Sequence, residues 1–295
     1  MKRTVLIFCL FILTAMNLSS QQNNFPVLTG PYLGQKPPGM IPELYTQGIV
    51  STNLDNHSRA AFSPDGTELF WSCSGDKLFI LYVKIENGYW TKPEKPEFCK
   101  DLECSNPVFS PDGKKLFFTS QVVESDQYYI SLWYVEKTTN GWSKRKKIDS
   151  ISNFGKVGYQ VSISKDNTMY FRSNNEGGFG GGDIYSVKFI NGEYSQPENL
   201  GPIINTDNIE ASPFISSNES FLLFRRVVRK ENGNVMDFFI SFHKEDDSWS
   251  EPKCISEQLN CVSQAFWIGL SPDQEYIFFV KTNRTQTSRE PSQMY

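Results

Sequence analysis

Histidine is scarce in this sequence, and the motifs of common metal and nucleotide sites are missing. The 295 residues include two histidines, His57 and His243, and no cysteine pair has C-x-x-C spacing, so we expect no metal site. There is no G-x-S-x-G, H-E-x-x-H or G-x-x-x-x-G-K-[ST] motif. The GGFGGG stretch at 177–182 joins two strands and no helical pattern follows it, so we expect no phosphate loop and no cofactor.

Long apolar runs are missing after the first residues. Residues 5–15 are apolar, but this run is short for a transmembrane helix. Lys2 and Arg3 precede it and small residues follow, which is the layout of a secretory signal cleaved after Ser20. An uncleaved anchor is the alternative. We therefore expect an exported protein, periplasmic, outer-membrane-associated or secreted, that does not span a membrane once the signal peptide, residues 1–20, is removed.

An excess of positive charge is also missing. The formal net charge is −4, and a mildly acidic surface disfavours binding to nucleic acid. The basic run KRKK at 144–147 is short and local, which is typical of a solvated strand edge. We expect no nucleic-acid partner.

The chain does contain one unit in five copies. These are FSPDGTELFWS (62–72), FSPDGKKLFFTS (109–120), ISKDNTMYFRS (163–173), ISSNESFLLFRR (215–226) and LSPDQEYIFFV (270–280). Their turn residues, Asp65, Asp112, Asp166, Asn218 and Asp273, are spaced by 47, 54, 52 and 55 residues. A period in this range indicates a propeller or a solenoid.

Each copy has the pattern of four short strands, and helical periodicity is absent. An apolar strand follows the turn, then an aromatic-centred strand such as LFILYVK (78–84). A polar turn leads to a strand that opens with an aromatic and a hydroxyl residue, such as YWTKPE (89–94). This pattern predicts an all-β fold, a β-propeller of four-stranded antiparallel blades. We expect five blades; six would need one more within residues 21–57, which is too short.

The two ends of the repeat region predict how the ring closes. The stretch IPELYTQGIV (41–50) resembles an outer strand that arrives before any inner strand, so we expect this N-terminal strand to close the last blade. SREPSQMY (288–295) is a shortened counterpart of a third strand. Residues 21–40, rich in proline and glycine, form an extended lead-in, and residues 41–295 form a single propeller domain, which we expect to be a monomer.

The repeated turn has a structural explanation. Ser63 begins a β-turn, Pro64 presets φ, Asp65 hydrogen-bonds locally and Gly66 takes the left-handed conformation. Five equivalent acids around a ring do not make a catalytic constellation. Function is better sought a few residues upstream, where the copies differ.

The quoted stretches resemble a known repeat. FSPDG followed by an apolar strand, GGFGGGDIY (177–185) and NGYWTKPE (87–94) are similar to the PD40 (WD40-like, TolB-type) β-propeller repeats of exported bacterial proteins. The resemblance covers about residues 40–295. It implies the fold and no particular activity, because such repeats share a scaffold and not one chemistry.

Two cysteine pairs occupy the same place in the repeat, between an outer strand and the next inner strand. An oxidising compartment favours the disulfides Cys99–Cys104 and Cys254–Cys261. Reduced, half-buried cysteines are the alternative. Cys73 is expected to be buried as a small apolar residue.

The residues just before each inner strand face the channel mouth in propellers, and polar and aromatic groups there suit a ligand site. The candidates for ligand binding are His57, Arg59, Asn106, Tyr159, Gln160, Glu210, Ser212 and Trp267. The alternative is that they bond within the channel and to water. We expect Arg172, Arg225 and Arg226, which end second strands, to be solvated.

Three functions are compatible with these features. The first is a binding or scaffold module that recognises a protein or cell-envelope partner at the channel face, which the missing motifs favour over an enzyme. The second is a glycan-active enzyme, a hydrolase or lyase, with Glu210 as acid/base and His57 or Arg59 assisting. Hydrolysis generally needs two carboxylates, and only Glu210 is present in the ring. The third is a structural subunit of an envelope assembly.

Overall fold

The computed structural model describes residues 25–295 except 40, 125–126, 153, 155–156, 229–230, 232, 260–264 and 283–289. The signal-peptide prediction for residues 1–20 lies outside this part. Within it, no helix is both long and apolar enough to cross a membrane.

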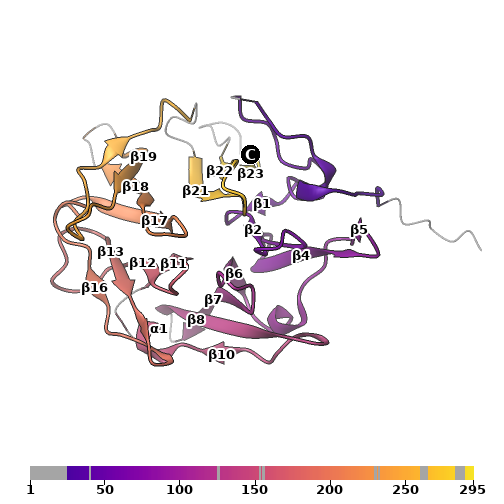
Figure 1. Ribbon diagram of the computed structural model, residues 1–295, viewed down its shortest axis with the longest axis horizontal. Helices are drawn as coiled ribbons and strands as arrows, with labels where there is room; N and C mark the ends of the chain where they lie inside the picture. The colour runs from indigo at the N-terminus through magenta and orange to yellow at the C-terminus, as the bar shows by residue number, and fades with distance from the viewer. Residues whose placement is uncertain are drawn as a thin grey trace, which may run out of the picture.

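The strands form five blades arranged around a central axis (Figure 1), which confirms the predicted five-bladed propeller. Blade 1 contains β1 (Asp55–Asn56), β2 (Ala61–Phe62), β3 (Glu68–Ser74), β4 (Leu78–Glu86) and β5 (Tyr89–Trp90). Blade 2 contains β6 (Cys104–Phe109), β7 (Lys115–Glu124), β8 (Gln127–Thr138), β9 (Gly141–Trp142) and β10 (Lys146–Lys147). Blade 3 contains β11 (Val157–Ile163), β12 (Met169–Ser173), β13 (Asp183–Val187) and β16 (Glu198–Asn199), with a hairpin of β14 (Phe189–Ile190) and β15 (Glu193–Tyr194).

Blade 4 contains β17 (Ile209–Ile215), β18 (Phe221–Val228), β19 (Val235–Phe242) and β20 (Lys253–Cys254), and blade 5 contains β21 (Ala265–Leu270), β22 (Ile277–Lys281) and β23 (Gln293–Met294). Short helical turns lie in the connections: η1 (Pro31–Gly34), η2 (Glu97–Cys99) and α1 (Asp149–Ser152). Neighbouring strands within each blade are antiparallel, as the repeat predicts.

The repeated turn has the structural role that its sequence predicts. The Ser63 hydroxyl donates to Asp65 Oδ1 at 2.5 Å, and the N–H of Gly66 donates to the carbonyl of Ser63 at 2.8 Å. Gly66 has φ 68°, in the left-handed region that glycine favours. The turn therefore links the innermost strand of each blade to the second strand.

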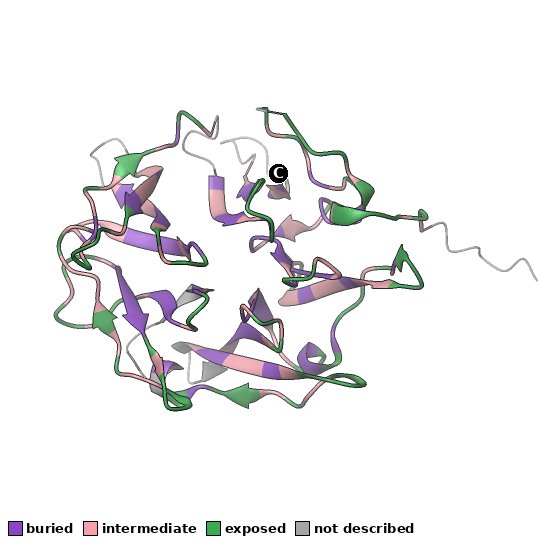
Figure 2. Cartoon of the chain, in the orientation of Figure 1, coloured by how far each residue is buried: buried purple, intermediate pink, exposed green. Residues whose placement is uncertain are grey.

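The core consists of apolar layers between neighbouring blades. Side chains alternate along a strand, so adjacent residues of a second strand face different neighbours. Phe118 packs toward blade 1 and Phe117 toward blade 3, while Phe224 packs toward blade 3 and Leu223 toward blade 5. Figure 2 shows buried residues along the strands and exposed ones at many of the connecting turns. Each blade depends on both neighbours to bury its two faces.

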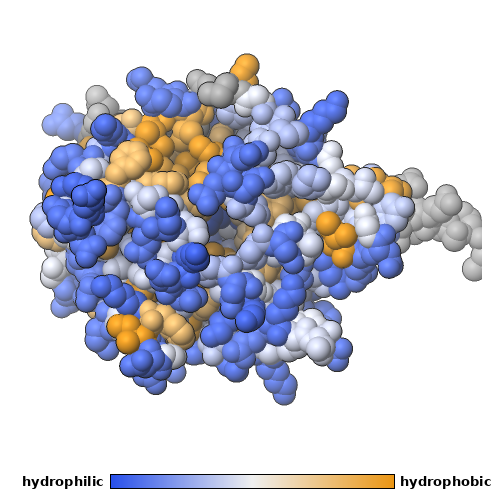
Figure 3. Space-filling model, viewed as in Figure 1, coloured by the Kyte–Doolittle hydropathy of each residue, from blue (hydrophilic) through white to orange (hydrophobic). Residues whose placement is uncertain are grey.

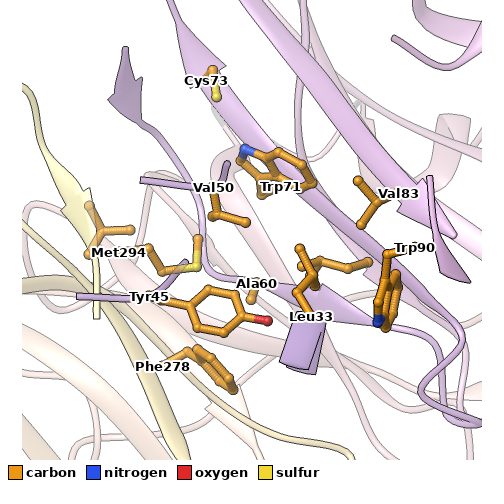
Figure 4. Packing of buried hydrophobic residues seen from close by; sticks show 12 residues of the cluster. Leu33, Tyr45, Val50, Ala60, Trp71, Cys73, Val83, Trp90, Phe278 and Met294 are labelled. Atoms are coloured by element: carbon orange, nitrogen blue, oxygen red, sulfur yellow. The ribbon is translucent and has the colours of Figure 1, made fainter. Parts of the chain in front are cut away.

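The N-terminal segment and β23 close the ring. Tyr45 donates its N–H to the carbonyl of Met294 at 2.8 Å, and Asn56 donates its N–H to the carbonyl of Ser292 at 2.8 Å. Figure 4 shows Tyr45 beside Phe278 and Met294, and the Tyr45 and Phe278 ring centroids are 4.9 Å apart. The predicted closure by the N-terminal segment is confirmed, although residues 41–50 form turns there and not a regular strand.

Candidate functional site

The innermost strands of blades 2 to 5 are irregular at the same place. Their pairing shifts between Ser105 and Val108, Val157 and Val161, Ala211 and Phe214, and Phe266 and Gly269. Asn106, Ser212 and Trp267 lie in these irregular stretches with φ of 55°, 55° and 52°. Bulges of this kind redirect a side chain and are common beside functional sites. We call Asn106, Gln160, Ser212 and Trp267, which share one repeat position, the mouth ring.

Arg59 occupies the same repeat position in blade 1, but its side chain spans the channel. Its guanidinium donates to the carbonyls of Pro213 (3.3 Å) and Ile268 (3.4 Å) and to that of Val161. These three carbonyls directly follow three residues of the mouth ring, so the ring surrounds the axis on which Arg59 lies. Burial lowers the pKa of Arg59 to about 10.

This geometry corrects the predicted role of Arg59. Both of its terminal nitrogens donate hydrogen bonds to main-chain carbonyls of blades 3, 4 and 5. Arg59 therefore links these blades, and its guanidinium is not available to bind a ligand or to assist catalysis. Gly269 makes room for it, because a Cβ there would lie 2.8 Å from Arg59 Cδ.

Arg59 separates two ends of the channel. On the side of the repeated turns lies a cavity of about 350 Å³, and Figure 3 shows a hollow at the centre of the molecule. Its polar groups are largely used internally: Ser110 and Ser271 donate to the turn carboxylates Asp112 and Asp273, and Ser162 accepts the N–H of Ile215. This cavity therefore has few hydrogen-bonding groups to offer a ligand.

The opposite end has polar groups without protein partners. Gln160 is 5 % exposed, and neither its Oε1 nor its Nε2 has a hydrogen-bond partner in the described part of the chain. Asn106 is 4 % exposed; its Nδ2 donates to Ser105 Oγ at 2.9 Å, while its Oδ1 lacks a partner among the described residues. An unpaired buried polar group costs about 1–3 kcal/mol, so such groups call for an explanation.

Trp267, which shares the repeat position of these amides, lies against two other rings. The rings of His57 and Trp267, from blades 1 and 5, have centroids 4.7 Å apart, and Phe266 lies 5.6 Å from Trp267. All three side chains are partly exposed. Of the predicted ligand-binding residues, the structure places His57 against Trp267, and Asn106, Gln160, Ser212 and Trp267 at one repeat position, while the side chain of Tyr159 lies outside the described part.

Glu210 does not have the predicted role of acid/base. Its side chain is fully buried, and Oε1 accepts from Arg226 Nε at 2.7 Å and from the Thr206 hydroxyl at 2.8 Å. Oε2 accepts the N–H of Thr206 at 3.0 Å. With both oxygens engaged, Glu210 holds Arg226 and the connection before β17 in place. Arg226 is correspondingly paired and not solvated, contrary to the sequence expectation.

Arg225 was also expected to be solvated, but two nitrogens of its guanidinium are buried. It lies over the Phe266 ring, 4.7 Å from its centroid, and its Nε and Nη1 are buried without a partner among the described residues. The corresponding positions in blades 1 and 2 carry Ser72 and Thr119. This departure from a small hydroxyl residue was a signal in the sequence.

The cysteines follow the prediction in part. Cys99 and Cys104 form a disulfide, and Cys73 is buried. Cys254 is exposed and has no disulfide partner among the described residues; Cys261, its predicted partner, lies outside them, so the Cys254–Cys261 disulfide stays a prediction. No group of three metal-binding side chains is found within the part of the chain that the structure describes.

Comparisons with known proteins bear on the fold. No protein-family model and no curated protein matches this sequence. Among solved structures, the endo-arabinase from Bacteroides thetaiotaomicron is 13% identical, with 83% of this chain and 95% of that chain covered at a TM-score of 0.51. A β-fructofuranosidase from Bombyx mori is 11% identical, with 84% and 61% covered at 0.51. A protein of unknown function from Dyadobacter fermentans is 9% identical, with 83% and 79% covered at 0.50.

At these identities the likeness establishes the fold alone. The two of these proteins with a stated activity are an endo-arabinase and a β-fructofuranosidase, and neither is a binding or scaffold module, so the expectation of a module for a protein or envelope partner is corrected.

Proposed function

We propose that this propeller is a glycan-active enzyme that binds a saccharide at the channel end opposite the repeated turns. The observation that carries the proposal is the pair of buried, unpartnered carboxamides in the mouth ring, Gln160 and Asn106. Saccharide hydroxyls both donate and accept hydrogen bonds, so they match the donor and the acceptors that these amides offer. The similarity of the fold to glycan-cleaving propellers supports the same proposal.

The aromatic side chains complete the recognition surface. Trp267 shares the repeat position of the amides and lies against the His57 ring, and ligand pockets combine such apolar faces with a few fixed polar groups. The cavity on the turn side is less suitable, since its serines and Arg59 bond within the protein. Water satisfying the amides is the competing explanation.

Glu210 is assigned a positioning role in this proposal. Hydrolysis by the usual mechanism requires two carboxyl groups flanking the scissile bond. Glu210 is the only carboxylate among the sequence-predicted mouth residues, and its partners fix it in an ion pair with Arg226. The proposal therefore rests on saccharide recognition by the mouth ring and not on an assigned acid and base.

A glycan panel tests the proposal. The protein is incubated with arabinan, fructan, xylan and polyuronides, and released ends are measured together with binding by calorimetry. We expect one class to be cleaved, with Gln160→Ala and Trp267→Ala each lowering kcat/KM at least about tenfold, the loss of one or two hydrogen bonds or an aromatic contact. Gln196→Ala, an exposed residue outside the ring, is the matched control and should leave kcat/KM unchanged.

Two results would count against this function. One is that no glycan of the panel is bound or cleaved. The other is cleavage that neither ring variant affects, because the reaction would then take place elsewhere.

A further inference from the structure

Arg225 reaches the mouth ring from the second strand of blade 4. It pairs with Ala211 in β17, immediately before Ser212 of the ring. The equivalent Ser72 accepts the Asn106 N–H at 2.8 Å, and Thr119 accepts from Asn106 Nδ2 at 3.2 Å, so this repeat position contacts the ring in blades 1 and 2. In blade 4 the equivalent residue, Arg225, contacts Phe266, which directly precedes Trp267 of the mouth ring.

The charge of Arg225 is not balanced by a carboxylate. Within the described residues no acidic group forms an ion pair with it, and two of its three guanidinium nitrogens are buried without a hydrogen bond. A second guanidinium, that of Arg172 in blade 3, adds to the positive charge. Burial, and then the charge of Arg172, lowers the pKa of Arg225 to about 10, a value at which it stays protonated at neutral pH.

The neighbouring residue, Arg226, is an arginine whose charge is balanced by a carboxylate. Arg226 is the next residue in β18 and is paired with Glu210 at 2.7 Å. The end of the channel near Arg225 is therefore a place where an added anion gains energy.

We infer that the saccharide bound at the mouth ring is a uronide, whose carboxylate is held by Arg225. This inference rests on the proposed function and names its substrate class. A planar guanidinium binds a planar carboxylate through two parallel N–H···O bonds, and such charge-assisted bonds are strong where water is excluded. The Phe266 ring covers one side of the guanidinium, so a carboxylate must approach Arg225 from another side.

The test compares acids with their own methyl esters. Oligosaccharides of galacturonate, glucuronate and mannuronate, each beside its uncharged methyl ester, are titrated into the full protein by calorimetry. At least one acid should bind ten times more tightly than its ester. Arg225→Met should remove that difference by weakening acid binding about tenfold while ester binding stays the same, and Arg225→Lys should restore part of it.

The outcomes separate the two claims. Equal binding of every acid and its ester, still dependent on Gln160 and Trp267, would overturn the uronide assignment and leave the glycan function standing. Binding of no saccharide would overturn both. Preference for a sulfated saccharide over every uronide would also overturn the assignment, since the anion would then be of another class. Comparison of acids and esters on the unmodified protein does not depend on the folding of any variant.

Discussion

At the scale of single residues, Arg59 shows how a repeat position can be reused. The other blades place a ring residue there, whereas blade 1 sends a guanidinium across the channel to carbonyls of three other blades. Sequence comparison identified the position as variable, and this was right. It could not show that the long side chain reaches the main chain of blades more than 100 residues away.

Replacing Arg59 by methionine should destabilise the protein. The substitution keeps the apolar stem but leaves three buried carbonyls without their donors, so we expect the free energy of unfolding to fall by about 2 kcal/mol. Urea unfolding followed by tryptophan fluorescence measures this. Arg59→Lys should recover little, because one ammonium cannot donate in three directions. If the variant unfolds with the same free energy as wild type within experimental error, the hydrogen bonds of Arg59 do not contribute to stability.

Glu210 leads to a second prediction at this scale. Glu210→Gln keeps the shape but leaves the Arg226 charge without its counter-ion, and breaking a buried ion pair costs about 3 kcal/mol. The loss of stability should accompany any loss of activity in this variant. If activity disappears while the unfolding curve is unchanged, Glu210 acts on substrate and the positioning role is wrong.

At the scale of elements, the repeated turn also anchors the lead-in segment. The Asp273 side chain accepts from the Ser271 hydroxyl and from the Tyr32 hydroxyl, and these two bonds lower its pKa below the ordinary value of 3.8. Burial and the same bond to Asp273 raise the pKa of Tyr32 to about 12. One carboxylate thus joins the turn of blade 5 to η1.

This arrangement predicts how stability depends on pH. A carboxylate with a depressed pKa in the folded state contributes stability above its unfolded value, and the contribution is lost as the pH falls through the folded value. Asp273→Asn should therefore be less stable than wild type near neutral pH, and the difference should shrink below about pH 4. Unfolding curves at a series of pH values check this. A difference that is the same at all pH values would contradict the ionised hydrogen-bonded carboxylate.

At the scale of the whole molecule, closure of the ring depends on a few hydrogen bonds between the two ends. Met294 accepts the N–H of Tyr45 and the hydroxyl of Ser51, and donates its own N–H toward Asn56 Oδ1 at 3.2 Å. Asn56 is buried and its Nδ2 also donates to the carbonyl of Val50 at 3.0 Å. It holds β23 and the N-terminal segment together.

Asn56→Ala should loosen this closure before the rest of the propeller. Loss of two buried hydrogen bonds costs about 1–3 kcal/mol, and the effect should concentrate where the ends meet. Hydrogen exchange should become faster at the amides of Met294 and Tyr45 while those of β12 in blade 3 keep their protection. Uniform acceleration over all blades would mean that the ring opens as one cooperative unit.

The repeat made most of the fold predictable, and the site only in part. Period, strand pattern and turn residues determine blades, because each blade needs the same turn and the same apolar layers. The mouth ring followed from the same alignment. The roles of Glu210 and Arg225 could not be predicted in this way. Whether a buried charge is paired depends on side chains of neighbouring blades, and an alignment of the repeats does not show which of these side chains meet.

The central claim is that the mouth ring binds a saccharide, and a crystal structure of the protein with a bound uronide oligosaccharide tests it most directly. The account predicts sugar density over Trp267, hydroxyls within hydrogen-bond distance of Gln160 and Asn106, and a carboxylate on Arg225. Sugar bound in the cavity on the turn side of Arg59, or away from the channel altogether, would contradict it.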